Sequence, residues 1–192
     1  MVYKERFIDP EQINEIIRLL QEMSAEQGFV AALAGGVAMQ VYGSPRLTKV
    51  VDFVLDQPLS EEGQLRKIKP LGFGGGSYQA PGGGKVDLIV RNDEYSALYQ
   101  DALQNIQITP QGIPIVAPEH LAAMKLAAAR EKDILDLKWL IRRLGLLDIP
   151  KTRSLVYRFM GRFAQDRFDD VVDQTTIEKE IMRRRGRDPE EE

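Results

Sequence analysis

The segment FVAALAGGVAMQVYGSPRLTKVVDFVL, residues 29–55, carries the pattern that decides the fold. It opens with an apolar run, residues 29–34, which stops at Gly35 and Gly36. A short apolar run that ends in glycines predicts a buried strand followed by a tight bend. Residues 37–42 then predict a short helix, so the diglycine lies between a strand and a helix.

Two further strands are predicted around isolated carboxylates. Residues 48–55 (TKVVDFVL) and 85–90 (KVDLIV) are rich in β-branched side chains, which favour strands. Asp52 is the acid inside the first run and Asp87 the acid inside the second. A buried carboxylate without a partner is costly, so a role in a site explains each acid better than a role in the core.

The remaining pattern adds helices and short strands. Helices are predicted at residues 9–27, 60–69, 93–104, 118–144 and 150–182. The glycine-rich stretch 71–84 predicts a hairpin turn, because it lacks the Lys-Ser/Thr ending of a phosphate-binding P-loop. Residues 113–116 predict a strand whose proline favours a sheet edge. We therefore expect an α+β (mixed α/β) fold, a small mixed sheet flanked by helices with further helices at the C-terminal end.

The same pattern divides the chain into three parts. Residues 1–116 are expected to form the α/β core, and residues 117–182 a helical part packed on it. Residues 183–192 hold four arginines followed by an acidic end, which predicts a disordered charged tail.

Composition excludes several kinds of chemistry. The 192 residues include no cysteine and one histidine, His120, so disulfides, thiolate zinc sites and cysteine nucleophiles are excluded. The net charge of -3 does not suggest a nucleic-acid coat or a cationic membrane surface. No apolar run reaches about 18 residues, and the start of the chain lacks a signal-peptide pattern. We therefore expect a cytoplasmic protein that does not contact a membrane.

Carboxylates holding a hard cation are the chemistry that this composition leaves open. Mg²⁺ prefers oxygen ligands and usually keeps some positions for substrate phosphate. The diglycine allows close approach of backbone to a phosphate, although it can also be a simple tight turn. Acids from neighbouring strands, Asp52 and Asp87, could then hold Mg²⁺ or Mn²⁺ beside a nucleoside triphosphate.

These elements, in this order and spacing, resemble the nucleotidyltransferase (DNA polymerase β-like) superfamily, in particular its bacterial minimal branch and the AbiEii-type toxins. The resemblance covers about residues 30–145. Gly35 and Gly36 match the glycine element of the family pattern, Asp52 its second acid and Asp87 its third. The resemblance implies that both acids are catalytic and hold the metal, and that the glycines bind the nucleotide.

One position departs from the family pattern. The first acid of the Asp-x-Asp pair falls at position 50, where this chain has Val50. Valine cannot bind a cation, so the hypothesis is that metal affinity and turnover are reduced, or that Asp56, Glu61 or another acid substitutes.

Further nucleotide contacts are predicted among polar residues around this motif. These residues are Arg46, Thr48, Lys49, Lys125, Arg130 and Lys132. Arg46 and Lys49 could equally be solvated, and Thr48 could simply form a turn. In a continuous helix Arg130 would lie on the apolar face, where it would need an anionic partner. Lys125, Lys132 and Asp136 would lie together on a separate stripe of the helix. This stripe could be solvated, or its cations could face the triphosphate.

The resemblance implies a metal-dependent nucleotidyltransferase that moves a nucleotidyl group from an NTP to a hydroxyl on RNA, protein or a small molecule. Similarity to the toxin branch implies a toxin–antitoxin or defence role, with an antitoxin as partner. The alternative, favoured by Val50, is a catalytically degenerate member that acts as a nucleotide-binding or protein-interaction module.

Overall fold

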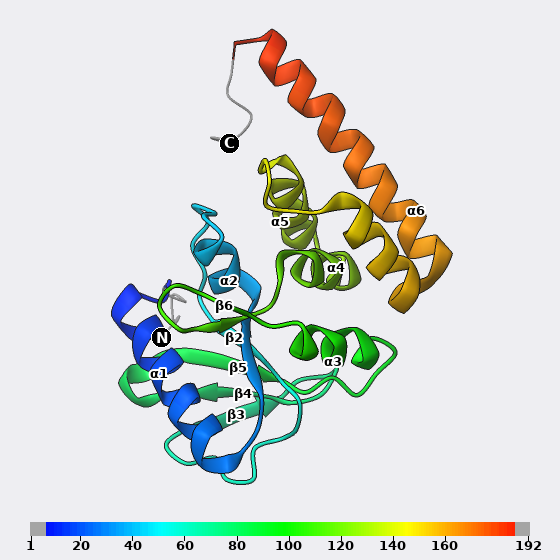
Figure 1. The fold of residues 1–192 in the computed structure, drawn as a ribbon. Helices are drawn as coiled ribbons and strands as arrows, with labels where there is room; N and C mark the ends of the chain where they lie inside the picture. Colours follow the sequence, from blue (N-terminus) through cyan, green and yellow to red (C-terminus); the bar gives the residue numbers. More distant parts are fainter. Residues whose placement is uncertain (1–6, 187–192) are drawn as a thin grey trace. The chain divides into compact units, whose positions relative to one another are not determined.

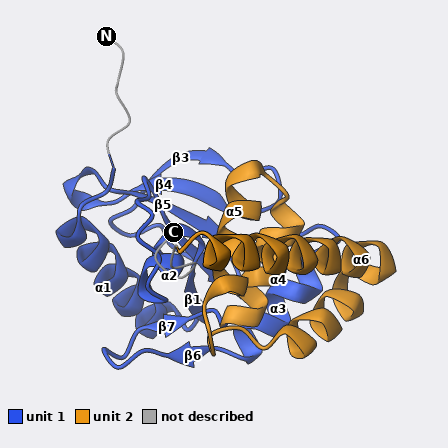
Figure 2. Ribbon diagram, turned by 90° about the horizontal axis from the view of Figure 1, so that it is seen from above, with its two compact units in different colours: residues 1–117 blue, residues 118–192 orange. Residues whose placement is uncertain are grey.

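A computed structural model describes residues 7–186 of the chain. The chain divides into two compact units, residues 1–117 and 118–192, which Figure 2 shows in different colours.

A mixed sheet forms the centre of the described part of unit 1 (Figure 1). Its strands are β1 (Ala31–Ala34), β2 (Val51–Leu55), β3 (Arg66–Pro70), β4 (Gly76–Gln79), β5 (Lys85–Ile89), β6 (Gln107–Ile108) and β7 (Pro114–Ile115). They lie in the order β3-β4-β5-β2-β1-β7-β6, and the pairs β2–β5 and β1–β7 are parallel whereas the others are antiparallel. The predicted mixed α/β fold is confirmed.

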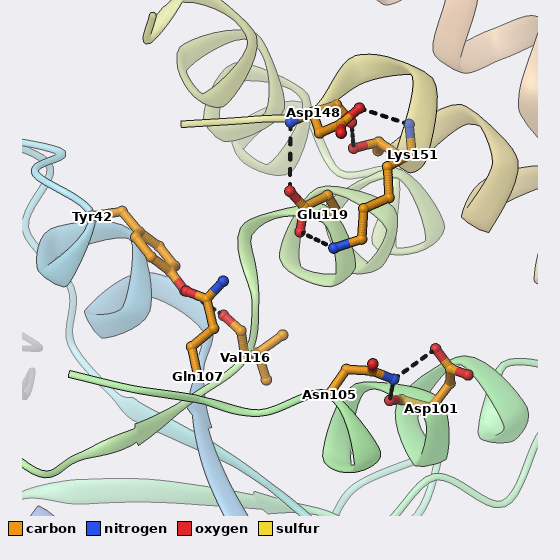
Figure 3. A network of polar contacts seen from close by, with 9 residues as sticks. Tyr42, Asp101, Asn105, Gln107, Val116, Glu119, Asp148 and Lys151 are labelled. Atoms are coloured by element: carbon orange, nitrogen blue, oxygen red, sulfur yellow. Dashed lines mark hydrogen bonds and ion pairs between the residues drawn. The ribbon is translucent and has the colours of Figure 1, made fainter. Parts of the chain in front are cut away.

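The helices of unit 1 begin and end close to the predicted positions. They are α1 (Pro10–Gln27), α2 (Gly35–Val41), a single 3₁₀ turn η1 (Pro81–Gly83), and α3 (Ser96–Gln104). The side chain of Asp9 accepts a hydrogen bond from the Gln12 N–H at the start of α1, and Gly28 ends this helix with φ 73°. At the end of α2, the Tyr42 hydroxyl donates to the Val116 carbonyl at 2.7 Å (Figure 3).

The helix predicted at residues 60–69 is wrong. Residues 66–70 form β3, which pairs with β4, and the residues before it form turns. The segment RKIKP is exposed throughout, so no apolar face stabilises a helix there, and pairing with the neighbouring strand decides its structure.

The strand predicted at residues 113–116 exists as β7, but its predicted place at the sheet edge is wrong. β6 pairs outside it and forms that edge. Pro114 is the first residue of β7, and a proline at the first position removes no hydrogen bond from within the strand.

Unit 2 is helical in its described part. It contains α4 (Pro118–Ala128), α5 (Glu131–Arg142) and α6 (Ile149–Arg184). Glu119 joins the start of α4 to the start of α6, because its carboxylate accepts from the Asp148 N–H at 3.5 Å and pairs with Lys151 Nζ at 3.4 Å (Figure 3).

The continuous helix predicted at residues 118–144 is wrong, because the chain leaves the helix between α4 and α5. Ala129 has φ 52°, and Arg130 is extended at φ -74° and ψ 153°. Arg130 therefore precedes α5 and does not lie in an apolar arc; its side chain is 63% exposed.

The last helix is interrupted at Gly161, where φ is 79° and ψ is -178°. It ends at Arg184, inside the segment predicted to be a disordered tail, and residues 187–192 of that segment lie outside the described residues. None of the helices in residues 7–186 is long and apolar enough to cross a lipid bilayer.

Candidate active site

Asp52 and Asp87 lie directly opposite each other on neighbouring parallel strands. The register of β2 and β5 pairs Asp52 with Asp87, and the Cα atoms of such partners are about 4.8 Å apart. Paired residues direct their side chains to the same face of a sheet, so both carboxylates share one face. On the opposite face the neighbouring side chains of Val51, Phe53 and Val86 are at most 2% exposed. The sheet thus presents two half-buried acids beside each other.

The diglycine bend packs directly against Asp52. β1 pairs with β2 so that Ala34 lies opposite Asp52, and the bend follows at once. The Gly36 N–H donates to Asp52 Oδ2 at 3.4 Å. A Cβ atom on Gly35 would lie 1.9 Å from the same oxygen, and Gly35 has φ +59°. Only glycine can hold both this backbone conformation and this contact.

Thr48 shapes the turn that leads into β2. The buried Thr48 hydroxyl donates to the Val50 carbonyl at 3.0 Å. A Cβ atom added to Gly36 would lie 2.7 Å from the hydroxyl oxygen of Thr48. Thr48 therefore packs the turn against the diglycine bend, as its structural interpretation predicts. In the same loop the Arg46 carbonyl accepts from Gln40 Nε2 at 2.8 Å. Lys49 is exposed, with Nζ 5.9 Å from the ring centre of Phe7.

No third acid in the described part of the chain joins the pair. Val50 lies at the bend before β2, and residues 7–186 contain no group of three or more Asp, Glu or His side chains that could hold a metal. Asp56 is four residues beyond Asp52, about 13 Å along an extended chain, and accepts from the Val30 N–H at 2.8 Å. Glu61 lies in an exposed loop, where its N–H donates to Gln27.

Asp87 carries a buried oxygen that needs a partner. Among the described residues no donor bonds its Oδ1. A buried carboxylate oxygen without a hydrogen bond or cation costs free energy, so this atom fits a metal ligand. With Asp52 beside it, the pair offers two oxygen ligands of the kind that Mg²⁺ prefers.

An arginine–aromatic cluster lies next to these acids and was missed by sequence reasoning. The Arg91 guanidinium lies 4.6, 5.2 and 4.9 Å from the ring centres of Phe73, Tyr95 and Tyr99. It also bonds Asp93 through two contacts of 2.8 and 2.7 Å. The spacing of Tyr95 and Tyr99, four residues apart at α3, is the signal that could have indicated a shared helix face.

Burial and charge together shift two pKa values in this cluster. Burial raises the pKa of the Tyr99 hydroxyl; Arg91 opposes this effect, and the charge of Asp52 adds to it. Tyr99 therefore stays protonated beside Asp52. Burial also pushes the pKa of Asp93 upward, but the hydrogen bond and charge of Arg91 outweigh it, so this pKa is lower than usual.

Comparisons with known proteins agree on the fold. The antigenic nucleotidyltransferase-like protein of Paracoccidioides brasiliensis is 19% identical, with a TM-score of 0.51 over 88% of this chain and 95% of that one. The antibiotic-resistance factor ANT(2'')-Ia is 16% identical, with a TM-score of 0.53 over 82% and 95%. A candidate nucleotidyltransferase of H. pylori is 13% identical, with a TM-score of 0.51 over 92% and 98%. The chain has a nucleotidyltransferase-like fold.

Comparison at the level of sequence identifies no relative. No family model and no curated protein matches the chain. The fold therefore rests on the structure and its neighbours.

The remaining predicted nucleotide contacts, Lys125, Arg130 and Lys132, lie in unit 2. Lys125 is buried and pairs with Asp133 at 3.1 Å and Asp136 at 2.6 Å. Arg130 pairs with Asp133 from the other side, and Lys132 is exposed. The prediction of a solvated stripe is wrong for Lys125 and Asp136, because the break at Ala129 changes which residues face one another.

The electrostatics of this buried group favour its charged form. Burial pushes the pKa of Asp133 upward, but Arg130 and Lys125 together lower it below its usual value. The group therefore holds α4 and α5 together within unit 2.

Proposed function

We propose that this protein is a metal-dependent nucleotidyltransferase that moves a nucleotidyl group from an NTP to a hydroxyl acceptor. The observation that carries the proposal is the in-register pair of Asp52 and Asp87 beside the diglycine bend. The similarity of the fold to nucleotidyltransferase-like proteins supports it.

Asp52 and Asp87 would hold Mg²⁺ or Mn²⁺. The buried Oδ1 of Asp87, which no described donor bonds, supports this assignment. A bound divalent ion supplies charge neutralisation on the phosphates of the NTP. Two protein carboxylates leave positions for phosphate oxygens and water, as is usual for Mg²⁺.

The chain's own residues would bind and orient the reactants. The diglycine bend packs against Asp52, so it would bring backbone close to a phosphate bound to a metal ion at that carboxylate. The acceptor oxygen would attack the α-phosphorus, the bond to pyrophosphate would break, and Asp87 would accept the hydroxyl proton. Within unit 1, further triphosphate contacts are assigned by prediction to Arg46, Thr48 and Lys49.

The finer assignments rest on the resemblance in the sequence. RNA, protein and small molecules are the acceptor classes it allows, and the AbiEii-type branch suggests a toxin or defence role in the bacterial cytoplasm with an antitoxin partner. The chemistry at Asp52 and Asp87 needs a hydroxyl acceptor but no antitoxin.

Val50 supports a second candidate function. Because no third acid in residues 7–186 is grouped with the two carboxylates, a degenerate member that binds nucleotide without transferring it also fits the site. Such a protein would act as a nucleotide-binding or interaction module.

Transfer of label from α-³²P-labelled NTPs, tested with Mg²⁺ and with Mn²⁺, separates the two functions. We expect transfer by the wild type and its loss in Asp52→Asn and Asp87→Asn. An inactive wild type beside an active Val50→Asp variant would establish the degenerate function instead. Equal activity of the wild type and Val50→Asp would show that position 50 is unimportant. Mg²⁺-dependent thermal stabilisation by NTPs tells binding from no binding in each variant.

A further inference from the structure

A row of polar side chains crosses the sheet outward from the acid pair. β5 pairs with β4 so that Ser77 lies opposite Asp87, and β4 pairs with β3 so that Lys69 lies opposite Ser77. Cross-strand partners share a face, so Lys69 lies on the face of Asp52 and Asp87. Two strand spacings, about 10 Å, separate the backbones of Asp87 and Lys69.

A β-bulge determines the face on which Lys69 lies. The register of β3 shifts between Lys67 and Lys69, so one extra residue, Ile68, is accommodated there. Without the shift, Ile68 would lie opposite Ser77, and Lys69 would point to the other face. Bulges of this kind often lie next to active sites, where they redirect a side chain.

Two more cations share this face. The next row pairs Lys85 with Gln79 and Gln79 with Arg66. We call Arg66, Lys69 and Lys85 the basic strip; all three side chains are exposed. No carboxylate in residues 7–186 pairs with Lys69. The strip is thus a concentration of positive charge on β3 and β5, in a protein whose net charge is -3.

The sheet order places the diglycine bend and the basic strip on opposite sides of the acid pair. The diglycine bend adjoins β1, on one side of Asp52, and β5, β4 and β3 follow on the other. In phosphoryl transfer the attacking and leaving oxygens are roughly in line. If the triphosphate lies at the bend, the attacking hydroxyl enters from the side of Asp87 and the strip. From β1 to β3 is about 19 Å, too far for one triphosphate to occupy both ends.

We propose that the basic strip binds the phosphate backbone of a single-stranded nucleic acid, whose terminal hydroxyl is the acceptor of the nucleotidyl group. This proposal rests on the proposed function and names its acceptor class. Exposed cations spaced over two strands match a ligand with several phosphates, because each phosphate contact adds a similar increment of binding.

Binding of a fluorescein-labelled 12-nucleotide single-stranded RNA to the full chain, without NTP or metal, tests the strip separately from catalysis. Fluorescence anisotropy over a series of KCl concentrations gives the salt dependence. We expect Lys69→Gln to weaken binding at low salt about threefold to tenfold and to reduce the slope of log K against log[KCl] by about 0.7, the value of one single-strand phosphate contact. The same measurement on single-stranded DNA tells whether the strip discriminates between the two polymers.

Lys67→Gln is the matched control. Lys67 is an exposed lysine of the same strand, but it lies opposite Tyr78 on the other face, where it pairs with Glu62 at 3.8 Å. We expect it to leave binding unchanged. The proposal is overturned if the wild type binds neither polymer, or if Lys67→Gln and Lys69→Gln weaken binding equally.

Label transfer distinguishes failure of this proposal from failure of the proposed function. Strip-dependent binding without any transfer would overturn the nucleotidyltransferase function and leave the nucleic-acid surface in place. Transfer to a protein or small molecule at the same rate in wild type and Lys69→Gln would preserve the function and overturn the acceptor assignment.

Discussion

Only glycine fits at position 35, for two reasons. Its φ of +59° is unfavourable for L-residues, and the place of a Cβ is already taken by the Asp52 carboxylate. The residue at position 35 therefore controls the position of Asp52, a predicted metal ligand. A substitution that displaces Asp52 can be distinguished from one that only strains a left-handed backbone.

Gly35→Ala should displace Asp52 as well as destabilise unit 1. We expect a loss of more than 2 kcal/mol in unfolding free energy, because a left-handed alanine costs about 1 kcal/mol and the clash adds to it. Nucleotide transfer should fall at least 100-fold. Urea unfolding followed by circular dichroism measures the first effect and label transfer the second.

Gly28→Ala is the matched control, since Gly28 has φ +73° and nothing within 4 Å of the added carbon. It should lose about 1 kcal/mol and keep full activity. An equal loss of stability and activity in the two variants would contradict the role given to the Gly35–Asp52 contact.

Sequence reasoning reached the acid pair but not the neighbouring cluster, for a physical reason. Asp52 and Asp87 stand out because each interrupts an apolar strand. Arg91 and Asp93 lie in a polar loop, where charged residues are ordinary, and only the packing of Phe73 and Tyr99 around the guanidinium distinguishes them. That packing depends on contacts distant in sequence.

At the scale of the element, no local sequence signal indicates the break between α4 and α5. Ala129 has no glycine or proline beside it, and the run AAAREKD favours a helix. The pairing of Lys125 with both Asp133 and Asp136 requires the break, because it brings the end of α4 back against α5. Burial of this charged group thus outweighs local helix propensity.

Ala129→Gly should stabilise unit 2. Glycine removes the strain of a φ of 52°, worth about 1 kcal/mol, but loses part of this gain through greater freedom in the unfolded chain, so we expect a net gain of about 0.5 kcal/mol. Trp139, the one tryptophan of the chain, lies in α5, and its fluorescence during urea unfolding reports on this unit.

Ala128→Gly, one residue earlier at the last residue of α4, should instead lose up to about 0.5–1 kcal/mol. Effects of the same sign in both variants would contradict the assignment of the strain to position 129.

At the scale of the whole molecule, three carboxylates link stability to pH. Burial alone would raise the pKa values of Asp93 and Asp133, but their cationic partners lower both from the usual 3.8. The hydrogen bond from Lys138 is the main cause that lowers the pKa of Glu178 from 4.5. A pKa that is lower in the folded state gives stability that is complete above the unfolded value and is lost as pH falls through the folded one.

The urea midpoint should therefore change little between pH 7 and pH 5 and fall steeply below about pH 4. Asp133→Asn should lower stability at pH 7 by about 3 kcal/mol, because Lys125 and Arg130 lose a buried partner, and should make the fall at low pH shallower. A midpoint that is the same at pH 7 and pH 3 would contradict this link.

The pairing of β2 with β5 has a consequence for how the protein is made. These parallel strands are joined through the β3–β4 hairpin, so their contact closes a long loop and forms later than local helices. A nascent chain that has emerged only as far as Gly84 lacks β5, one of the two neighbours of β2, and the apolar strand β2 then has one open edge that invites association with other chains. A chain that terminates before Lys85 should therefore be inactive and should aggregate.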